Sequence, residues 1–453
     1  MTPRRTGSLL AALLAAAIAA GPAAAVAPPT VVVATNPPDD PPSPEYPMKQ
    51  VKGCLAAGVL PDSDLSQSPP PDRALDLPRA RALSRGTAVT VAVLDTGISP
   101  NTRLPNLVGG GDYMQTGGDG LSDCDAHGTL VAGIIGAAAD PGDGFLGVAP
   151  DARIISIRYR SGAFSPDAAQ NLDAAQQLSL EVRKLARAIT HAANLGADVI
   201  TVALPICVPA DLGVDQSTLS AAVGYAFHIR GALIVAGAGS TAGGGGCAQN
   251  PDIDPGRPND PRNWDGVKTI ATPGWFANEV LTVGFTSATG DPMGESLTGP
   301  WVSLAAPGTG IESLGPGGGG LINGVGAPDK LVPVGGASFA AAYVSGTAAL
   351  LRSRFPNETP AQIAVRLQAS AHAPARGTDN SIGAGMIDPL AALSFRTPPQ
   401  SATGPYRAAP LVIPPPARPA DGRPGGVAAG VLLCCVLLGS GISVAHKAIR
   451  RRQ

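Results

Sequence analysis

The sequence has few charged residues. Asp, Glu, Lys and Arg make up 15% of its 453 residues, and the formal net charge at pH 7 is −2. A protein that binds nucleic acid needs a basic surface to neutralise the phosphates. The composition therefore argues against a nucleic-acid partner, and we expect none.

The patterns of metal and phosphate sites are also missing. The chain has no C-x-x-C motif and no closely spaced pair of histidines, so a zinc site is not expected. No loop has the Asp and Asn spacing of a calcium site, which leaves calcium binding undecided. A phosphate-binding loop follows a strand and opens a helix. The glycine runs at 243–246 and 317–320 do neither. We therefore expect no metal and no cofactor.

The N-terminus has the pattern of a secretory signal peptide. Arg4 and Arg5 precede an apolar run at 9–20, and the small residues at 23–25 form a cleavage site of the A-x-A type. This apolar run is too short to span a bilayer. We expect residues 1–25 to be a signal peptide that is removed; the alternative is an Ala-rich start without structure.

The C-terminus predicts a membrane anchor. Residues 425–445 carry no charge, and at about 1.5 Å per residue a helix of this length crosses the hydrocarbon core. The basic tail at 446–453 belongs in the cytoplasm. With an exported N-terminus, we expect a single-pass protein of the cell membrane whose main part is extracytoplasmic. A buried core helix is the alternative.

Two proline-rich segments flank the central part of the chain. Residues 26–80 have too few apolar side chains for a core of their own, so we expect an extension that wraps around another domain. Residues 397–424, which include Pro414–Pro416, predict a semi-rigid linker to the membrane segment.

The six cysteines form two groups. Cys434 and Cys435 lie in the predicted membrane segment, where small packing residues are expected. The others lie in the exported part, an oxidising setting in which an even number suggests disulfides. They are Cys54, Cys124, Cys207 and Cys247. Four cysteines allow three connectivities, and free buried thiols are the alternative.

Residues 81–396 alternate apolar strands with helical stretches. Strands are expected at 89–94, 152–157, 198–202, 232–236, 280–285 and 301–305, and helices after His127, through 178–195, at 217–230 and at 360–371. This alternation predicts βαβ units, and hence an α/β fold in which a parallel sheet has helices on both faces. The polar, Ala-rich stretch 160–177 is expected to be a surface insertion.

Ser338 stands at the start of a predicted helix. Gly335 and Gly336 permit a tight bend before it, and the run from Phe339 to Arg352 is small and apolar enough for a buried helix. Unpaired N–H groups and the helix dipole at this end would stabilise a nearby oxyanion, as an acyl-transfer nucleophile requires. For this segment alone, a simple helix cap is the alternative.

Two further motifs supply the partners that a nucleophilic serine needs. Asp95 follows the apolar run 91–94, at the end of a strand where open α/β sheets place functional groups. His127 begins a small, apolar helical run; a structural histidine is the alternative. The order Asp95, His127, Ser338 is one of the known orders of a catalytic triad.

Three blocks together resemble the subtilisin-like serine proteases. They are Asp-Thr-Gly at 95–97, His-Gly-Thr at 127–129 and Gly-Ala-Ser-Phe-Ala at 336–340. Within that superfamily, residues 118–129 and Lys-Gly-Cys at 52–54 resemble the mycosins, membrane-anchored subtilases of actinobacterial type VII secretion systems. The resemblance covers about residue 41 to the C-terminus.

This resemblance implies the disulfides Cys54–Cys124 and Cys207–Cys247, and an N-terminal extension that stays attached to the catalytic domain. It also implies cleavage of selected exported proteins and association with the secretion membrane complex. In such a triad, His127 takes the proton of Ser338 as this serine attacks a peptide carbonyl, and Asp95 orients the imidazole.

The expected oxyanion hole departs from the family pattern. Subtilases place an Asn after an Ala-Gly strand end, whereas Ser240 occupies that position in the block 235–240. Three alternatives stay open: Ser240 donates, directly or through water; Asn250 or another loop residue substitutes; or only the Ser338 N–H remains. Loss of one such donor costs about a hundred- to thousandfold in turnover in subtilisin. We therefore expect a slow or highly selective protease.

An extended substrate is expected along the edges of 200–204 and 235–238, by strand addition. The candidate substrate-binding residues, of which the first three suggest an apolar P1 pocket, are Val202, Ala203, Leu204, Ala236 and Gly237. The leading hypothesis is an extracytoplasmic serine endopeptidase. The alternative is a structural component of the secretion complex whose proteolysis is feeble or dispensable.

Overall fold

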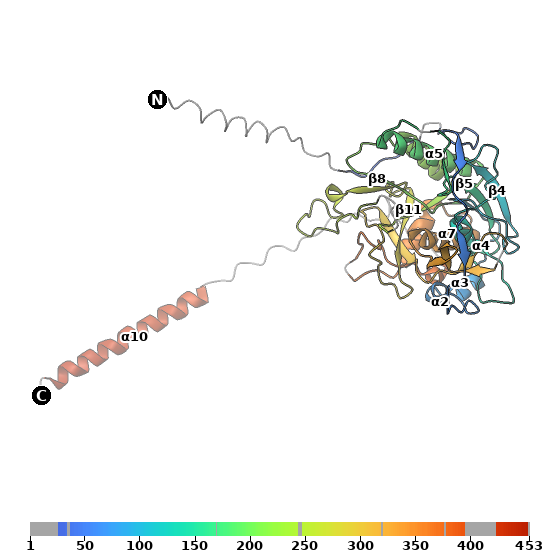
Figure 1. The fold of residues 1–453 in the computed structure, drawn as a ribbon. Coiled ribbons are helices and arrows are strands. Elements are labelled where there is room, and N and C mark those ends of the chain that lie inside the picture. Colours follow the sequence, from blue (N-terminus) through green and yellow to red (C-terminus); the bar gives the residue numbers. More distant parts are fainter. Residues whose placement is uncertain are drawn as a thin grey trace, which may run out of the picture. The chain divides into compact units, whose positions relative to one another are not determined.

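The chain forms two compact units, Met1–Tyr406 and Arg407–Gln453. The structure, a computed structural model, describes residues 26–33, 37–168, 170–242, 247–318, 320–375, 377–394 and 423–451 (Figure 1). The predicted signal peptide and nearly all of the predicted linker lie outside the described residues, as does the glycine run at 243–246.

A seven-stranded parallel sheet forms the centre of the first unit. Its strand order is β12-β11-β9-β7-β3-β5-β4, and all neighbouring strands run parallel. The strands are β3 (Thr90–Asp95), β4 (Leu107–Asp112), β5 (Arg153–Arg158), β7 (Val199–Val202), β9 (Leu233–Gly237), β11 (Val280–Thr286) and β12 (Val302–Pro307). Nearly every residue of the inner strands is buried, because their apolar runs are covered on both faces. The predicted α/β fold is confirmed.

Helices cover the two faces of this sheet in pairs (Figure 1). α4 (His127–Gly136) packs against α7 (Ala337–Arg354), and α5 (Ala174–Asn194) packs against α6 (Ser217–Gly224). α7 is almost fully buried against the sheet, which its run of alanines permits. The helix expected at 217–230 is instead α6 followed by a π-helix, Tyr225–Ile229.

The N-terminal extension is held against the two helices α5 and α6. The N–H of Val32 donates to Oγ of Ser220 in α6, at 3.1 Å. In α5, the guanidinium of Arg187 donates to the carbonyl oxygens of Pro41 and Ser43, at 2.8 and 3.1 Å. The described residues before Tyr46, 26–33 and 37–45, thus contact these two helices without forming a helix or strand.

Further along, the extension joins two small sheets. β1 (Met48–Gln50) pairs with β6 (Phe164–Pro166), and β2 (Ala56–Gly58) pairs with β15 (Gly324–Ala327). The described residues of the stretch 160–177 lie mostly at the surface, in agreement with the expected surface position. The stretch also pairs with the extension through β6 and includes the start of α5.

Short elements complete the first unit. β8 pairs with β10, β13 with β14, and β16 with β15. The elements not yet bounded are β8 (Ile206–Pro209), β10 (Thr269–Thr272), β13 (Ser313–Leu314), β14 (Leu321–Ile322), β16 (Lys330–Pro333), α2 (Pro70–Ala74), α3 (Leu77–Leu83), η2 (Trp264–Gly266), α8 (Pro360–Ser370) and α9 (Pro389–Ser394).

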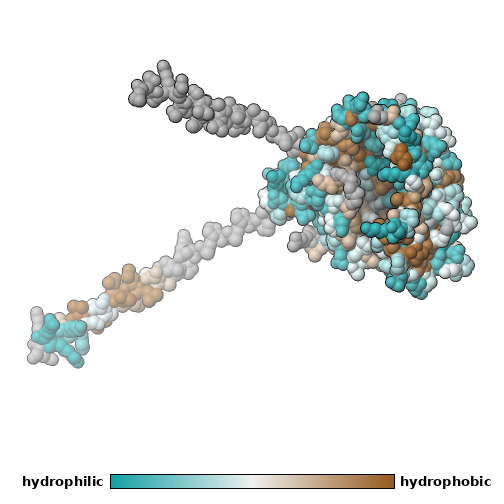
Figure 2. Space-filling view, in the orientation of Figure 1, coloured by the Kyte–Doolittle hydropathy of each residue, from teal (hydrophilic) through white to brown (hydrophobic). Residues whose placement is uncertain are grey.

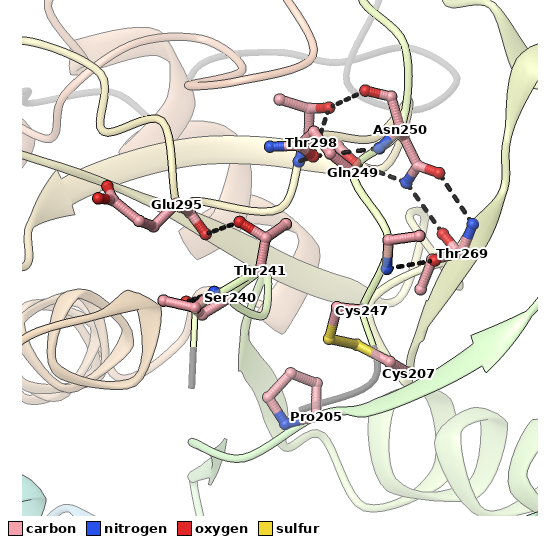
Figure 3. The surroundings of a disulfide bond; sticks show 12 residues. Pro205, Cys207, Ser240, Thr241, Cys247, Gln249, Asn250, Thr269, Glu295 and Thr298 are labelled. Carbon is pink, nitrogen blue, oxygen red and sulfur yellow. Dashed lines mark hydrogen bonds between the residues drawn. A yellow bond between two sulfur atoms is a disulfide. The ribbon is translucent and has the colours of Figure 1, made fainter. Parts of the chain in front are cut away.

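Two disulfides link distant parts of the first unit. Cys54 of the extension is bonded to Cys124, and Cys207 of β8 is bonded to Cys247. This is the pairing that the mycosin resemblance implies. The first bond joins the extension to the segment just before α4, and the second lies beside the loop that follows β9 (Figure 3).

The described residues of the second unit, 423–451, form one helix, α10 (Arg423–Arg450). Its segment Ala428–Arg450 is long and apolar enough to cross a membrane, with a mean hydropathy of 2.2. Figure 2 shows a hydrophobic stretch on this helix and a hydrophilic C-terminal end. The helix is longer than the expected span, because helical structure continues through the basic residues Lys447 and Arg450.

Candidate active site

Asp95 is the last residue of β3, and its side chain is fully buried. Gly97, with φ of 95°, lets the chain turn sharply after the strand, since a Cβ there would lie 2.0 Å from the carbonyl oxygen of Ser122. Asp95 Oδ1 accepts the N–H of Thr96 at 2.7 Å, and Oδ2 has no partner among the described residues. The carboxylate is therefore fixed by its own turn.

His127 is the first residue of α4 and connects the other two triad candidates. Its Nδ1 lies 2.7 Å from Asp95 Oδ1, and its Nε2 lies 2.9 Å from Ser338 Oγ. The ring also packs against Phe339, with 5.1 Å between ring centroids. Three side chains that are far apart in the sequence therefore form one continuous chain of hydrogen bonds.

Ser338 is the second residue of α7. Gly336, just before the helix, has φ of 136°, a conformation that favours glycine. The N–H groups of the first helical turn have no intrahelical acceptor, so the N–H of Ser338 points out of the helix beside its own hydroxyl. The positive end of the helix dipole lies at the same place.

The electrostatic environment favours a protonated His127. Burial lowers the pKa of His127, but the carboxylates of Asp95, Asp123 and Asp125 together raise it more, Asp95 most of the three, so that the net pKa lies above its ordinary value. In the neutral ring, Nδ1–H can donate to Asp95 while Nε2 accepts the hydroxyl proton of Ser338. This tautomer leaves Nε2 ready to take that proton.

Asp123 connects the end of β3 to the start of α4. Its Oδ1 accepts from Thr96 Oγ1 at 2.8 Å, and its Oδ2 accepts from Oγ1 and the N–H of Thr129, at 2.7 and 2.9 Å. Burial raises the pKa of Asp123 to about 6. Sequence reasoning did not single out Asp123; its only signal was its place in the block 118–129.

Ser240 lies in the loop after β9. Its Oγ accepts the N–H of Ala242 at 3.2 Å, and its backbone forms an isolated bridge with Ser296 (Figure 3). The hydroxyl proton is not used in that bond, so Ser240 can still act as a donor.

Asn250 is a structural residue, and the expectation that it could supply the oxyanion donor is wrong. Its side chain is 4% exposed. Nδ2 donates to the carbonyl oxygens of Thr269 and Thr298, at 2.9 and 2.7 Å, and Oδ1 accepts the N–H groups of Lys268 and Thr269 (Figure 3). Both N–H groups of the side-chain amide therefore already donate to backbone carbonyl oxygens and are not available to an oxyanion.

The candidate substrate residues divide into two groups. Val202, Ala203 and Ala236 are buried in the core, so their side chains cannot line a P1 pocket in this conformation. Gly237 is packed against Ala337, whose carbonyl oxygen would be 3.3 Å from an added Cβ. Only Leu204 lines the cavity beside His127.

Strand addition to β7 or β9 is also excluded. β7 pairs with β3 and β9, and β9 pairs with β7 and β11, so neither strand has a free edge. An extended peptide can reach only the residues beyond the strand ends, such as Leu204, whose carbonyl oxygen already accepts the hydroxyl of Tyr159.

A cavity of about 940 Å³ opens beside the triad. His127 and Phe339 lie on its wall, and most of the rest of the wall is apolar. On the face seen in Figure 2, hydrophobic side chains gather in patches between polar ones. Sequence reasoning missed the part of this wall that the extension supplies, namely Tyr46, Met48 and Leu55.

Within the described ranges, no group of three or more His, Cys, Asp or Glu side chains is placed to hold a metal ion. The hydrogen-bonded side chains of Asp95, His127 and Ser338 place a carboxylate, an imidazole and a serine hydroxyl in sequence, the arrangement that performs acyl transfer.

Comparisons with known proteins agree with this arrangement. The model of the subtilase family matches residues 86–385. Mycosin-3 of Mycobacterium tuberculosis is 46% identical over 422 residues, which cover 91% of this chain and 90% of that protein.

Two solved structures extend the likeness to the fold. The serine protease MycP1, an essential component of the type VII (ESX-1) secretion system, has a TM-score of 0.78 and 47% identity, covering 82% of this chain and 100% of that one. A chain in an intact ESX-5 inner membrane complex has a TM-score of 0.80 and 45% identity, covering 92% and 99%. The chain therefore belongs to the subtilase family of serine proteases and, within that family, to the mycosins.

Proposed function

We propose that this chain is a membrane-anchored, extracytoplasmic endopeptidase in which Ser338 is the nucleophile, His127 the general base and Asp95 the residue that orients the histidine. The observation that carries this proposal is the chain of hydrogen bonds, 2.7 Å from Asp95 to His127 and 2.9 Å from His127 to Ser338. These are the distances that proton transfer in acyl transfer requires.

The hydrogen bonds define the steps. Nε2 of His127 takes the hydroxyl proton as Ser338 Oγ attacks the peptide carbonyl, and the carboxylate of Asp95 stabilises the imidazolium that forms. Nε2 then returns the proton to the leaving amine, which breaks the peptide bond and leaves an acyl group on Ser338. Water hydrolyses that ester by the same proton transfers in reverse.

The oxyanion would be held by the N–H of Ser338 and by the hydroxyl of Ser240. Because a hydroxyl is shorter than an amide, the second contact is weaker than the one an Asn makes. We expect slow or highly selective turnover, since one missing donor costs about a hundred- to thousandfold.

The chain would work beside a type VII secretion membrane complex. This part of the proposal is supported by α10, which is long and apolar enough to anchor the protein, and by the relative that is part of the ESX-5 inner membrane complex. The catalytic unit would then face outward and the basic C-terminus inward. The same relative, together with Ser240, favours a second candidate: a structural component of the complex whose proteolysis is feeble or dispensable.

A fluorophosphonate probe tests the nucleophile directly. Labelling of the full chain in membranes that disappears in Ser338→Ala supports the peptidase. Absence of labelling in the folded wild-type protein contradicts it. Secretion that persists in cells carrying only Ser338→Ala supports the structural role.

Replacing Ser240 tests the oxyanion hole. Ser240→Asn restores a longer donor, so peptide turnover is expected to rise by about a hundredfold, and Ser240→Ala should lower it. Equal turnover in wild type and Ser240→Asn contradicts this account of slow catalysis. Fluorophosphonate labelling measures the fraction of each variant in which Ser338 is reactive, so that turnover can be compared per active molecule.

A further inference from the structure

The helix that carries His127 begins without a side-chain cap of its own. Its N-cap residue is Ala126, which has no side-chain acceptor and lies in the left-handed region, with φ of 63°. The first N–H groups of a helix have no intrahelical partner, so they need acceptors from elsewhere. Since His127 is the first residue of α4, the groups that supply these acceptors also fix the position of the imidazole.

Acceptors for two of these N–H groups come from Thr96 and Asp123. Thr96 Oγ1 accepts the N–H of Gly128 at 3.0 Å, and Asp123 Oδ2 accepts the N–H of Thr129 at 2.9 Å. A Cβ on Gly128 would lie only 3.2 Å from the Cβ of Asp95, so the start of the helix lies directly against the end of β3. The contacts that begin α4 therefore also bring His127 to Asp95.

Asp123 joins these anchor points through one carboxylate. Its Oδ1 accepts the hydroxyl of Thr96 at 2.8 Å and the N–H of Asp125 at 3.0 Å. Its Oδ2 accepts the hydroxyl of Thr129 at 2.7 Å as well as the N–H of that residue. Donors thus approach both oxygens. An Asn at this place would turn an NH₂ group toward the donors on one side, because only a carboxylate has two acceptor oxygens.

The charge of Asp123 also acts on the triad. The residue is 7% exposed, and its hydrogen-bond partners in the described part of the chain are all neutral groups. Burial raises the pKa of Asp123 to about 6, which leaves the carboxylate ionised at neutral pH, and its charge raises the pKa of His127. A neutral Asn or Ser caps a helix about as well as Asp does, so capping alone does not explain a buried charge here.

We infer that Asp123 is a positioning residue of the triad, which holds the imidazole of His127 between its two partners and adds a second negative charge to stabilise the imidazolium. It acts through Thr96 and Thr129 and is not among the residues that line the cavity. The inference rests on the proposed peptidase function, because it assigns a role within that triad.

Asp123→Asn tests the charge and the second acceptor oxygen together. kcat of the full chain should fall by about ten- to a hundredfold with little change in KM, because a small displacement of the imidazole slows proton transfer. The midpoint of the acid limb of kcat/KM should also move to lower pH. One carboxylate that raises the pKa of His127 is then lost, while those of Asp95 and Asp125 remain. A merely structural role would lower stability without moving this midpoint.

Two variants of Thr129 separate positioning from charge. Thr129→Val removes the hydroxyl that donates to Asp123 and accepts the N–H of Ser99 at 3.0 Å. Fluorophosphonate labelling should become slower by about tenfold, while the midpoint moves less than in Asp123→Asn. Thr129→Ser keeps the hydroxyl and should restore the labelling rate. If Asp123→Asn does not fold, equal labelling rates in wild type and Thr129→Val still overturn the inference.

Asp112→Asn is the matched control. Asp112 is also a buried carboxylate at the end of a strand, β4, but it pairs with Arg158. This variant should lower the free energy of unfolding and leave kcat and the midpoint unchanged. Equal kcat and an equal midpoint in wild type and Asp123→Asn overturn the inference, as does a Thr129→Ser variant as slow as Thr129→Val. Absence of labelling in the wild type would instead contradict the proposed function.

Discussion

Loss of the Arg187 guanidinium should release the extension. This side chain is 5% exposed and donates to Pro41 O, Ser43 O, Ser43 Oγ and Glu45 Oε1, at 2.8, 3.1, 3.1 and 2.7 Å. Glu45 is 11% exposed, so Arg187→Met leaves a nearly buried carboxylate without its main partner. Breaking a buried pair in this way costs about 3–5 kcal/mol.

The cost should appear as local opening of residues 39–51. At about 1.4 kcal/mol per factor of ten, amide hydrogen exchange in this segment should become faster by roughly a hundred- to a few-thousandfold. The amide of Val51 is a useful reporter, since it donates to Ala163 O at 2.8 Å. Peptide-level mass spectrometry measures the rate.

Arg183 provides the matched control, because it pairs with the same Glu45. Its guanidinium is 3.6 Å from Glu45 and its side chain is 55% exposed, so Arg183→Met should cost about 0–1 kcal/mol. Equal exchange in the two variants would refute the reasoning that burial decides the strength of these contacts. Faster exchange over the whole catalytic unit would show that Arg187 supports the core and not the extension alone.

Two further predictions concern the triad and the second disulfide. The acid limb of the pH profile of kcat/KM should have its midpoint above pH 6.5, because only neutral His127 can accept a proton. Burial lowers the pKa of His127, but the neighbouring carboxylates, chiefly Asp95, raise it above its ordinary value. Asp95→Asn should move this midpoint down and reduce turnover by about 10⁴-fold, so an unmoved midpoint in a pH–rate profile would contradict the assignment. Replacing Cys207 and Cys247 by serine removes a cross-link with a sequence separation of 40, which should lower the free energy of unfolding by about 4 kcal/mol. Urea denaturation of the wild type and of this double serine variant, both without reductant, measures the loss; equal free energies of unfolding would contradict it.

The parallel sheet could be predicted because most of its strands are continuous apolar runs. β4 could not be predicted, since its sequence, Leu-Val-Gly-Gly-Gly-Asp, has little strand propensity and pairs only because β5 is beside it. The pairing of β2 with β15 was also missed, because residues 56–58 and 324–327 are distant in the sequence and no local pattern reports their contact.

The site shows the same division between local and tertiary information. The residue types at 95, 127 and 338, and their order along the chain, identify the triad from the sequence alone. Asn250 was misjudged because its residue type indicates a donor, whereas burial and backbone partners decide whether that donor is free. The ion pair between Arg160 and Glu181 could not be predicted, since these residues meet only when α5 packs beside the end of β5.

The disulfide between Cys54 and Cys124 keeps the extension attached to the rest of the protein when the chain between them is cut. An inhibitory leader can diffuse away after one backbone cut, but a nick between residues 55 and 123 leaves both fragments covalently joined. The protein would migrate as two pieces only after reduction. Its maturation, if it involves such a nick, would therefore need a reductant as well as a protease before Met48 could leave the cleft.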